Sequence, residues 1–186
     1  MFGLIQSIHG TWPAVRYLVR PYDDLVFRDF SVRPLTATEN VLLATATLGN
    51  LNWCGDRFSA TDVHTRPEFS HYTVFDPQRG DFGWVAQAGE EAIGVVWAQY
   101  LPPSDPGYGF LAEDTPEVSL WVRNDWRGQG GGRALLRQVQ DDARVRGVLR
   151  LSLSVEAANY ARKLYRAEGF VDVPGREADG VMAWSP

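Results

Sequence analysis

Three consecutive glycines stand where a helix is expected to begin. The stretch RGQGGG at 127–132 joins a predicted strand, 116–122, to a predicted amphipathic helix, 133–146. Glycine costs about 1 kcal/mol relative to alanine inside a helix, so this run serves some purpose other than helix stability. Glycine lets another molecule approach the backbone closely, and the first N–H groups of a helix attract anions such as phosphates. The sequence therefore predicts an anion-binding turn rather than a flexible linker.

Two common phosphate-binding loops match this stretch less well. A Walker loop needs Gly-Lys-Ser/Thr after the glycines, whereas Gly132 is followed by Arg133. A dinucleotide-binding fingerprint, G-x-G-x-x-G, would need glycine where Arg133 stands. Because a strand that ends in an acid, Glu156, does follow, an NAD(P) site remains a minor alternative.

The glycine stretch and a second segment together resemble a known enzyme family. The residues at 127–132 are similar to the Q/R-x-x-G-x-G/A loop with which the GNAT superfamily of N-acetyltransferases binds the pyrophosphate of acetyl-CoA. After a predicted strand at 149–155, the segment NYARKLYRAEGF at 159–170 resembles the N-x-A-x-x-L-Y-x-x-x-G-F pattern near the end of many members. Two motifs in the family's order and spacing make the resemblance specific over 117–170 and general elsewhere.

The resemblance implies how acetyl-CoA would be held. The glycine backbone would bind the pyrophosphate, and the preceding strand would separate from its parallel neighbour to open a cleft for the pantetheine arm. Asn159 would hydrogen-bond to this arm, although asparagine is also a common helix N-cap. A backbone N–H near Trp121 would polarise the thioester carbonyl, as an oxyanion donor does. The cofactor-binding residues expected on this basis are Trp121, Val122, Arg127, Gly128, Gln129, Gly130, Gly131, Gly132, Arg133 and Asn159.

Two residues are expected to act on the reacting groups. Tyr165 matches the family's tyrosine that hydrogen-bonds or protonates the departing thiolate, although its helical spacing also fits a core aromatic. Glu117 begins the central strand, where many members place a catalytic glutamate; the alternative is a solvated carboxylate. Its pKa, ordinarily about 4.3, would have to be raised by desolvation for it to serve as the base for an amine. His64 and His71 are weaker candidates for this base.

Composition argues against several other classes of protein. With 186 residues, 45% of them hydrophobic, the chain is long enough for one globular domain. Its formal net charge of −5 disfavours nucleic-acid and anionic-membrane partners, and no apolar run reaches the roughly 20 residues that span a bilayer. A single cysteine, Cys54, fits a reducing cytoplasm, and the Cys/His spacing predicts no metal site. Nothing around Cys54 suggests the activation that a covalent acetyl intermediate would need.

The other segments fit one acetyltransferase domain, 23–186, preceded by an N-terminal extension, 1–22. Residues 25–34 predict a first strand. The apolar spacing at 39–48 predicts a helix that Gly49 would end.

Two irregular segments are expected to border the amine site. Segment 50–81 contains aromatic residues from Trp53 to Phe75, which would shape that site or simply fill the core, and a helix is expected to begin near Ser59. The loop 101–115 is long for a compact domain and leads directly into the central strand, so it is expected to border the acceptor pocket; the alternative is a merely solvated loop.

A hairpin at 82–100 and two closing strands at 171–173 and 181–184 complete the expected sheet. The predicted fold is α/β (α+β) and GNAT-like. It has a mixed, mostly antiparallel sheet of six to seven strands, helices on both faces and a splayed central strand pair.

The resemblance implies transfer of an acetyl group from acetyl-CoA to a primary amine, by direct attack in a ternary complex. The acceptor would be a small molecule or a peptide and not a nucleic acid. The protein is expected to be cytoplasmic, and if it forms an oligomer, a homodimer is expected. The alternative function is a domain that binds acetyl-CoA without catalysis, as a sensor or structural subunit.

Overall fold

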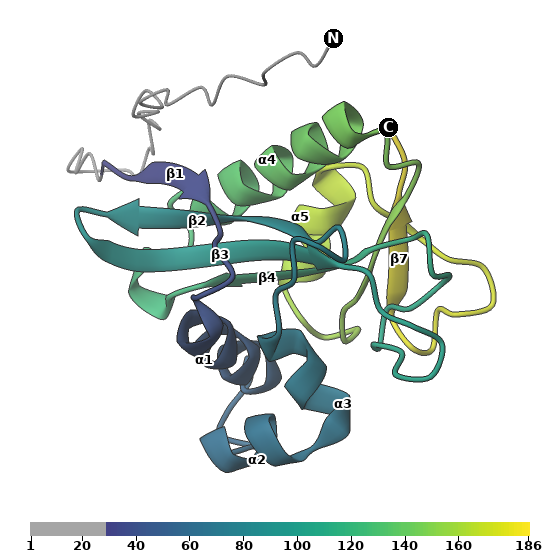
Figure 1. Ribbon diagram of the computed structural model, residues 1–186, viewed down its shortest axis with the longest axis horizontal. Coiled ribbons are helices and arrows are strands. Elements are labelled where there is room, and N and C mark those ends of the chain that lie inside the picture. Colours follow the sequence, from purple (N-terminus) through teal and green to yellow (C-terminus); the bar gives the residue numbers. More distant parts are fainter. Residues whose placement is uncertain (1–28) are drawn as a thin grey trace, which may run out of the picture.

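The computed structural model describes residues 29–186. Figure 1 shows a twisted sheet with helices packed against it. The strands are β1 (Ser31–Pro34), β2 (Phe82–Ala88), β3 (Glu91–Gln99), β4 (Glu117–Val122), β5 (Leu151–Ser154), β6 (Val171–Asp172) and β7 (Val181–Trp184). The helices are α1 (Asn40–Leu51), α2 (Ala60–Thr65), α3 (Pro67–Ser70), α4 (Gly131–Arg146) and α5 (Ala161–Ala167), with short 3-10 turns η1 (His71–Thr73) and η2 (Asn124–Trp126).

The sheet has seven strands in the order β1-β2-β3-β4-β5-β7-β6. Neighbouring strands are antiparallel except for the central pair, β4 and β5, which is parallel. This confirms the predicted mixed, mostly antiparallel sheet. The predicted N-terminal extension, 1–22, and the start of the strand predicted at 25–34 lie outside the described residues.

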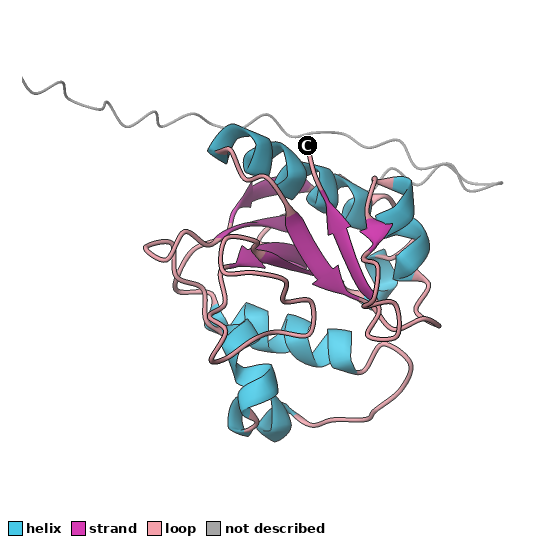
Figure 2. Cartoon of the chain, turned by 90° about the vertical axis from the view of Figure 1, so that its right-hand side faces the viewer, coloured by secondary structure: helices cyan, strands magenta, loops and turns pink. Residues whose placement is uncertain are grey.

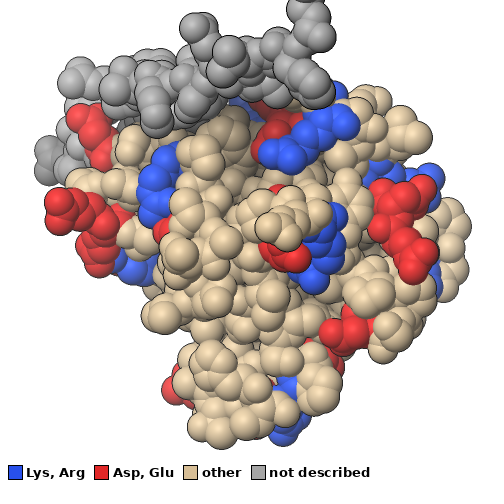
Figure 3. Space-filling model, viewed as in Figure 1, with Lys and Arg blue, Asp and Glu red and all other residues tan. Residues whose placement is uncertain are grey.

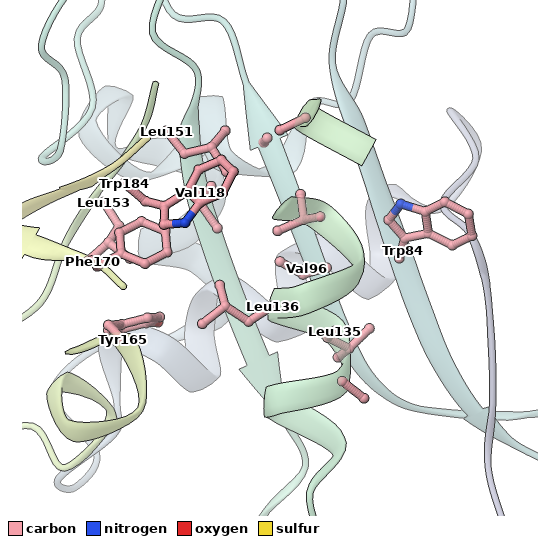
Figure 4. Close-up of a cluster of buried hydrophobic side chains, with 14 of the residues drawn as sticks. Trp84, Val96, Val118, Leu135, Leu136, Leu151, Leu153, Tyr165, Phe170 and Trp184 are labelled. Carbon is pink, nitrogen blue, oxygen red and sulfur yellow. The ribbon is translucent and has the colours of Figure 1, made fainter. Parts of the chain in front are cut away.

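Helices cover both faces of the sheet, as Figure 2 shows. On one face α4 and α5 bury an apolar layer against the strands, and Leu136, Val118 and Phe170 meet there (Figure 4). On the other face α1 and η1 cover a second cluster that includes Leu43 and Trp97. Burial of both layers supplies the apolar contacts that hold the sheet between its helices.

Helix α1 is longer than predicted, because Gly49 does not end it. The helix continues through Gly49 to Leu51. A Cβ atom at Gly49 would lie 2.2 Å from Nε1 of Trp121, so glycine is needed here for close packing of the indole and not as a cap. The predicted end at 48 is therefore wrong.

The central strands β4 and β5 separate soon after they meet. Their ladder contains the single pair Glu117–Ser152, whereas β4 pairs with β3 along its whole length. The predicted splayed pair is confirmed, and it leaves space between the carboxyl ends of β4 and β5.

The surface carries charges of both signs. On the face in Figure 3, basic and acidic side chains lie close to one another rather than in one patch of a single sign. Within residues 29–186 no helix is long and apolar enough to cross a membrane.

Candidate active site

A cavity of about 730 Å³ lies where β4 and β5 separate. Residues of the glycine stretch, α4 and α5 line one side of it, and residues of α1, α3, η1 and the loop 101–115 line the other. The separated strands thus let a single cavity reach both layers of helices. We call these two sides the donor half and the acceptor half.

The donor half is built on the turn that precedes α4. Gly128 and Gly130 have φ values of +73° and +84°, a backbone conformation that glycine adopts without strain. Within the described residues, a Cβ atom at either position would meet no heavy atom closer than 4 Å. The turn therefore exposes its backbone at the start of the 16-residue helix α4, where N–H groups favour a phosphate.

Two residues of the glycine stretch are oriented differently from the others. Gly131 and Gln129 line a smaller cavity beside Phe30 and Trp126, and Nε2 of Gln129 donates to the carbonyl of Asp125 at 2.9 Å. Arg127, Gly128, Gly130, Gly132 and Arg133 line the main cavity. A role for Gln129 and Gly131 toward acetyl-CoA would therefore have to come through their backbone.

Both arginines at the donor half are held by neighbours. Nε of Arg127 donates to the carbonyl of Val122 at 2.9 Å, which closes the turn onto β4. Nε of Arg133 lies 2.8 Å from Oε1 of Glu168, which also binds Arg137. Since the side chain of Arg133 is 53% exposed, its guanidinium remains accessible to an anion in the cavity.

Strand β4 presents alternate side chains to the two halves, as its pleat requires. Val122 belongs to the apolar cluster under α4, whereas Trp121 packs beside Gly49 of α1. Both side chains line the cavity, as does Asn159 before α5. Oδ1 of Asn159 accepts the backbone N–H of Ala161 at 2.9 Å, so it stabilises the start of α5, and its contact with the pantetheine arm remains a prediction.

Glu117 is a buried carboxylate at the junction of the two halves. The residue is only 5% exposed, which rules out the solvated alternative. Oε1 accepts the hydroxyl proton of Tyr72 at 2.8 Å, whereas Oε2 has no hydrogen-bonding partner within residues 29–186. Burial raises the pKa of Glu117 to about 7, against the opposing effects of hydrogen bonds from Tyr72 and from the backbone N–H of Gly109. A carboxylate of this pKa is suited to exchange a proton near neutral pH.

The loop 101–115 covers this carboxylate, in agreement with the expectation that it borders the acceptor site. The hydroxyl of Tyr72 accepts the backbone N–H of Tyr108 at 2.8 Å. A Cβ atom at Gly107 would lie 2.1 Å from Oε2 of Glu117 and 2.6 Å from the Tyr72 hydroxyl. Glycine at 107 therefore lets the loop close over Glu117.

Tyr165 lies on α5 at the border between core and cavity. It is 7% exposed, its ring centroid lies 5.8 Å from that of Phe170 (Figure 4), and it also lines the cavity. Burial raises the pKa of Tyr165 above its ordinary value. Its phenol therefore stays protonated and can donate a hydrogen bond or a proton.

The weaker candidates lie elsewhere. His71 is buried and Nδ1 lies 2.9 Å from Oδ1 of Asp105, whereas His64 on α2 and Cys54 are exposed. Of the residues described, none of these three lines the cavity. No cluster of His, Cys, Asp and Glu that could hold a metal occurs within 29–186.

Tyr72 was the main residue that sequence reasoning did not single out. It belongs to the aromatic segment 50–81, where a role in the amine site and a role in the core were both open. Four of these aromatic residues do line the cavity, namely Trp53, Phe58, Phe69 and Tyr72, and Phe75 packs in the core. The helix predicted near Ser59 is confirmed as α2, which Ser59 and Asp62 cap reciprocally.

Comparison with known proteins decides the family. The family model described as "Acetyltransferase (GNAT) family" matches residues 47–170. The chain belongs to the GNAT acetyltransferase family. It is therefore an acyltransferase, and the acetyl donor of this GNAT protein is acetyl-CoA.

Solved structures agree with this GNAT fold. The PaiA N-acetyltransferase from Thermoplasma acidophilum, in complex with coenzyme A, is 15% identical with a TM-score of 0.62, over 84% of this chain and 99% of that one. The GNAT domain of S. lividans PAT is 24% identical with a TM-score of 0.60, over 85% and 91%. The ribosomal-protein-S18-alanine N-acetyltransferase from Escherichia coli is 20% identical with a TM-score of 0.56, over 84% and 93%. A search of curated proteins found no match.

Proposed function

We propose that this protein transfers the acetyl group of acetyl-CoA to a primary amine in a ternary complex, with Glu117 as the general base. The observation that supports this most strongly is the state of the Glu117 carboxylate. One oxygen is held by Tyr72, the pKa is raised to about 7, and the residue lines the same cavity as the glycine turn. A merely structural domain would have little use for a buried carboxylate in that position.

The residues of the donor half fit acetyl-CoA. The exposed backbone of Gly128 and Gly130, the N-terminus of α4 and the guanidinium groups of Arg127 and Arg133 would hold its phosphates. The gap between β4 and β5, bordered by Trp121, Val122 and Asn159, would take the arm that follows. When bound, acetyl-CoA supplies a thioester whose carbonyl carbon forms the new bond to the amine nitrogen while the carbon–sulfur bond breaks.

Glu117 and Tyr165 would handle the two protons of this exchange. The ammonium ion first loses a proton to solvent, and the neutral amine then loses a second one as the amide bond forms, which Glu117 would accept directly or through one water. Tyr165, kept protonated by burial, would give a hydrogen bond or its proton to the departing sulfur. Exchange with solvent then removes the proton from Glu117 and restores that of Tyr165, and the products are the acetylated amine and CoA, in equal amounts.

The proposal is tested by incubating the purified protein with acetyl-CoA and a panel of primary amines. The panel should include arylalkylamines, alkylamines, a polyamine, an aminoglycoside and short peptides with free N-termini. Mass spectrometry would follow CoA and acetylated amine together, which avoids thiol reagents that react with the exposed Cys54.

We expect one class of amine to be acetylated with equal release of CoA, and Glu117→Gln to slow this about a hundredfold or more while acetyl-CoA still binds. Binding of acetyl-CoA without turnover of any amine would favour the alternative of a non-catalytic sensor or structural subunit. Binding of NADH and not of acetyl-CoA would contradict the proposal altogether.

A further inference from the structure

Several aromatic rings line the acceptor half. Phe58 and Phe69 meet edge to face with their centroids 4.9 Å apart, and Trp53 and Tyr72 line the same side of the cavity. Tyr108 adds a fifth ring, which is 52% exposed in spite of its size. Its backbone N–H donates a hydrogen bond to the Tyr72 hydroxyl. This bond holds the backbone that carries the exposed ring next to the cavity.

Besides Glu117, two carboxylates that line the cavity already have partners. Oε1 of Glu156 lies 2.9 Å from Arg57, and Oε2 accepts the indole N–H of Trp53 at 3.1 Å. Asp179 is paired with Arg176 at 2.7 Å. A polycationic acceptor would bind several carboxylates, and two of those at this cavity are already in ion pairs with arginines.

The buried polar atoms that lack partners are few. Among the described residues that line the cavity, they are Oε2 of Glu117 and Oγ1 of Thr47. Both atoms are covered by protein, Oε2 by the loop at Gly107, so they offer few hydrogen bonds to a ligand. The many hydroxyls of a polyhydroxylated acceptor would lose their hydrogen bonds to water against aromatic rings.

Resting on the proposed function, we propose that the acceptor is a primary amine joined by a short link to an aromatic or similarly bulky apolar group. The amine faces Glu117, and the apolar group lies against Phe58, Phe69 and Tyr108. A free arylalkylamine and a peptide with an aromatic N-terminal residue both have this chemistry. The two sources are separated by experiment.

The test compares amines that differ in the attached group. We expect kcat/KM for 2-phenylethylamine to exceed that for n-propylamine by about tenfold or more, since apolar contact with a pocket is worth factors of this size. Spermidine and kanamycin should be poorer still. A Phe-Ala-Ala peptide amide and a Ser-Ala-Ala peptide amide, compared with 2-phenylethylamine, show whether the natural source is a peptide N-terminus or a free amine.

Variants of Tyr108 test whether the aromatic side chains of the acceptor half cause the preference for 2-phenylethylamine over n-propylamine. Tyr108→Ala should lower the ratio of kcat/KM between 2-phenylethylamine and n-propylamine about threefold or more, through a higher KM for 2-phenylethylamine. Tyr108→Phe keeps the ring and should keep the ratio. Val74→Ala is a matched control, because Val74 is 51% exposed and lies outside the cavity.

A preference for spermidine, kanamycin or n-propylamine would overturn this inference while leaving the proposed function intact. So would a Tyr108→Ala protein that discriminates as well as the wild type. If the protein binds acetyl-CoA but acetylates no amine at all, the proposed function fails and the inference fails with it.

Discussion

The donor half and the acceptor half of the cavity are built in different ways. The phosphate-binding turn of the donor half depends on consecutive residues, because the turn at 127–132 and the start of α4 present backbone groups whose positions follow from local conformation. The acceptor half depends on residues far apart in the sequence: Tyr72 and Glu117 are 45 positions apart, and Trp53 and Glu156 are 103 apart. The turn of the donor half is thus formed locally, whereas the acceptor half is formed by tertiary packing.

This difference predicts how the two halves respond to substitution. A change in the donor half should weaken acetyl-CoA binding and so affect every acceptor equally. A change in the acceptor half should leave acetyl-CoA binding intact and alter the rate, its pH dependence or the choice of amine. The substitutions that follow test this separation, beginning with the largest expected effect.

Gly132→Trp should remove detectable acetyl-CoA binding. A Cβ atom at Gly132 would already lie 3.5 Å from Leu164 and 3.6 Å from Val122, so an indole would fill the cavity between β4 and α5. Calorimetric titration measures the loss. Val145→Trp is the matched control, because Val145 lies on the same helix and is 87% exposed. A folded Gly132→Trp protein that binds like the wild type would contradict the position of the donor half.

Glu117→Gln should lower kcat about 10²- to 10⁴-fold, the range typical for loss of a general base, with little change in the Kd of acetyl-CoA. The amide keeps the size of the side chain but does not accept a proton. Glu113→Gln, an exposed residue of the loop 101–115, serves as the control. Equal kcat values for Glu117→Gln and the wild type would assign the base to another group.

The same substitution should stabilise the protein at alkaline pH. Burial raises the pKa of Glu117 from 4.5 to about 7, so the folded chain binds this proton more tightly than the unfolded chain. The resulting stability is fully present below about pH 4.5 and is lost as the pH rises through about 7. At pH 8 we expect the free energy of unfolding of Glu117→Gln to exceed that of the wild type by up to about 3 kcal/mol. Near pH 4.5 we expect the two proteins to have similar free energies of unfolding. Urea unfolding at both pH values measures this, and a constant difference would contradict it.

Tyr72→Phe should lower kcat about tenfold and raise the kinetic pKa above that of the wild type. The Tyr72 hydroxyl donates to the carboxylate at 2.8 Å and so lowers the pKa of Glu117. Its loss also leaves the N–H of Tyr108 without this acceptor. A pH–rate profile measures both effects, with Tyr100→Phe as the control outside the cavity. An unchanged profile would mean that Tyr72 does not position Glu117.

The separation of the halves also explains what could be predicted from the sequence. The strand–turn–helix around 127–132 and the strand Glu117–Val122 follow from periodicity and from glycine chemistry, and the structure confirms them. The end of α1 could not be predicted, because Gly49 is a close-contact residue for Trp121 and not a cap. No local pattern distinguishes these two uses of glycine.

The environment of Glu117 was beyond prediction for a similar reason. Its position at the start of a strand marked it as a candidate, but its burial comes from the loop 101–115, and its hydrogen bond from Tyr72 in another segment. Likewise, nothing in the sequence shows that Arg133 binds Glu168 or that Arg57 binds Glu156. These facts depend on tertiary contacts between distant residues.

The pH dependence of a single turnover tests most directly whether Glu117 joins the two halves. Enzyme saturated with acetyl-CoA is mixed with an accepted amine, and the rate of acetyl transfer is measured from pH 5 to 9 for the wild type and for Glu117→Gln. We expect the wild-type rate to rise with an apparent pKa of about 7, as the carboxylate ionises, and the variant to lack this rise while it binds acetyl-CoA normally. The same rise near pH 7 in both proteins would contradict a role for Glu117 as the base.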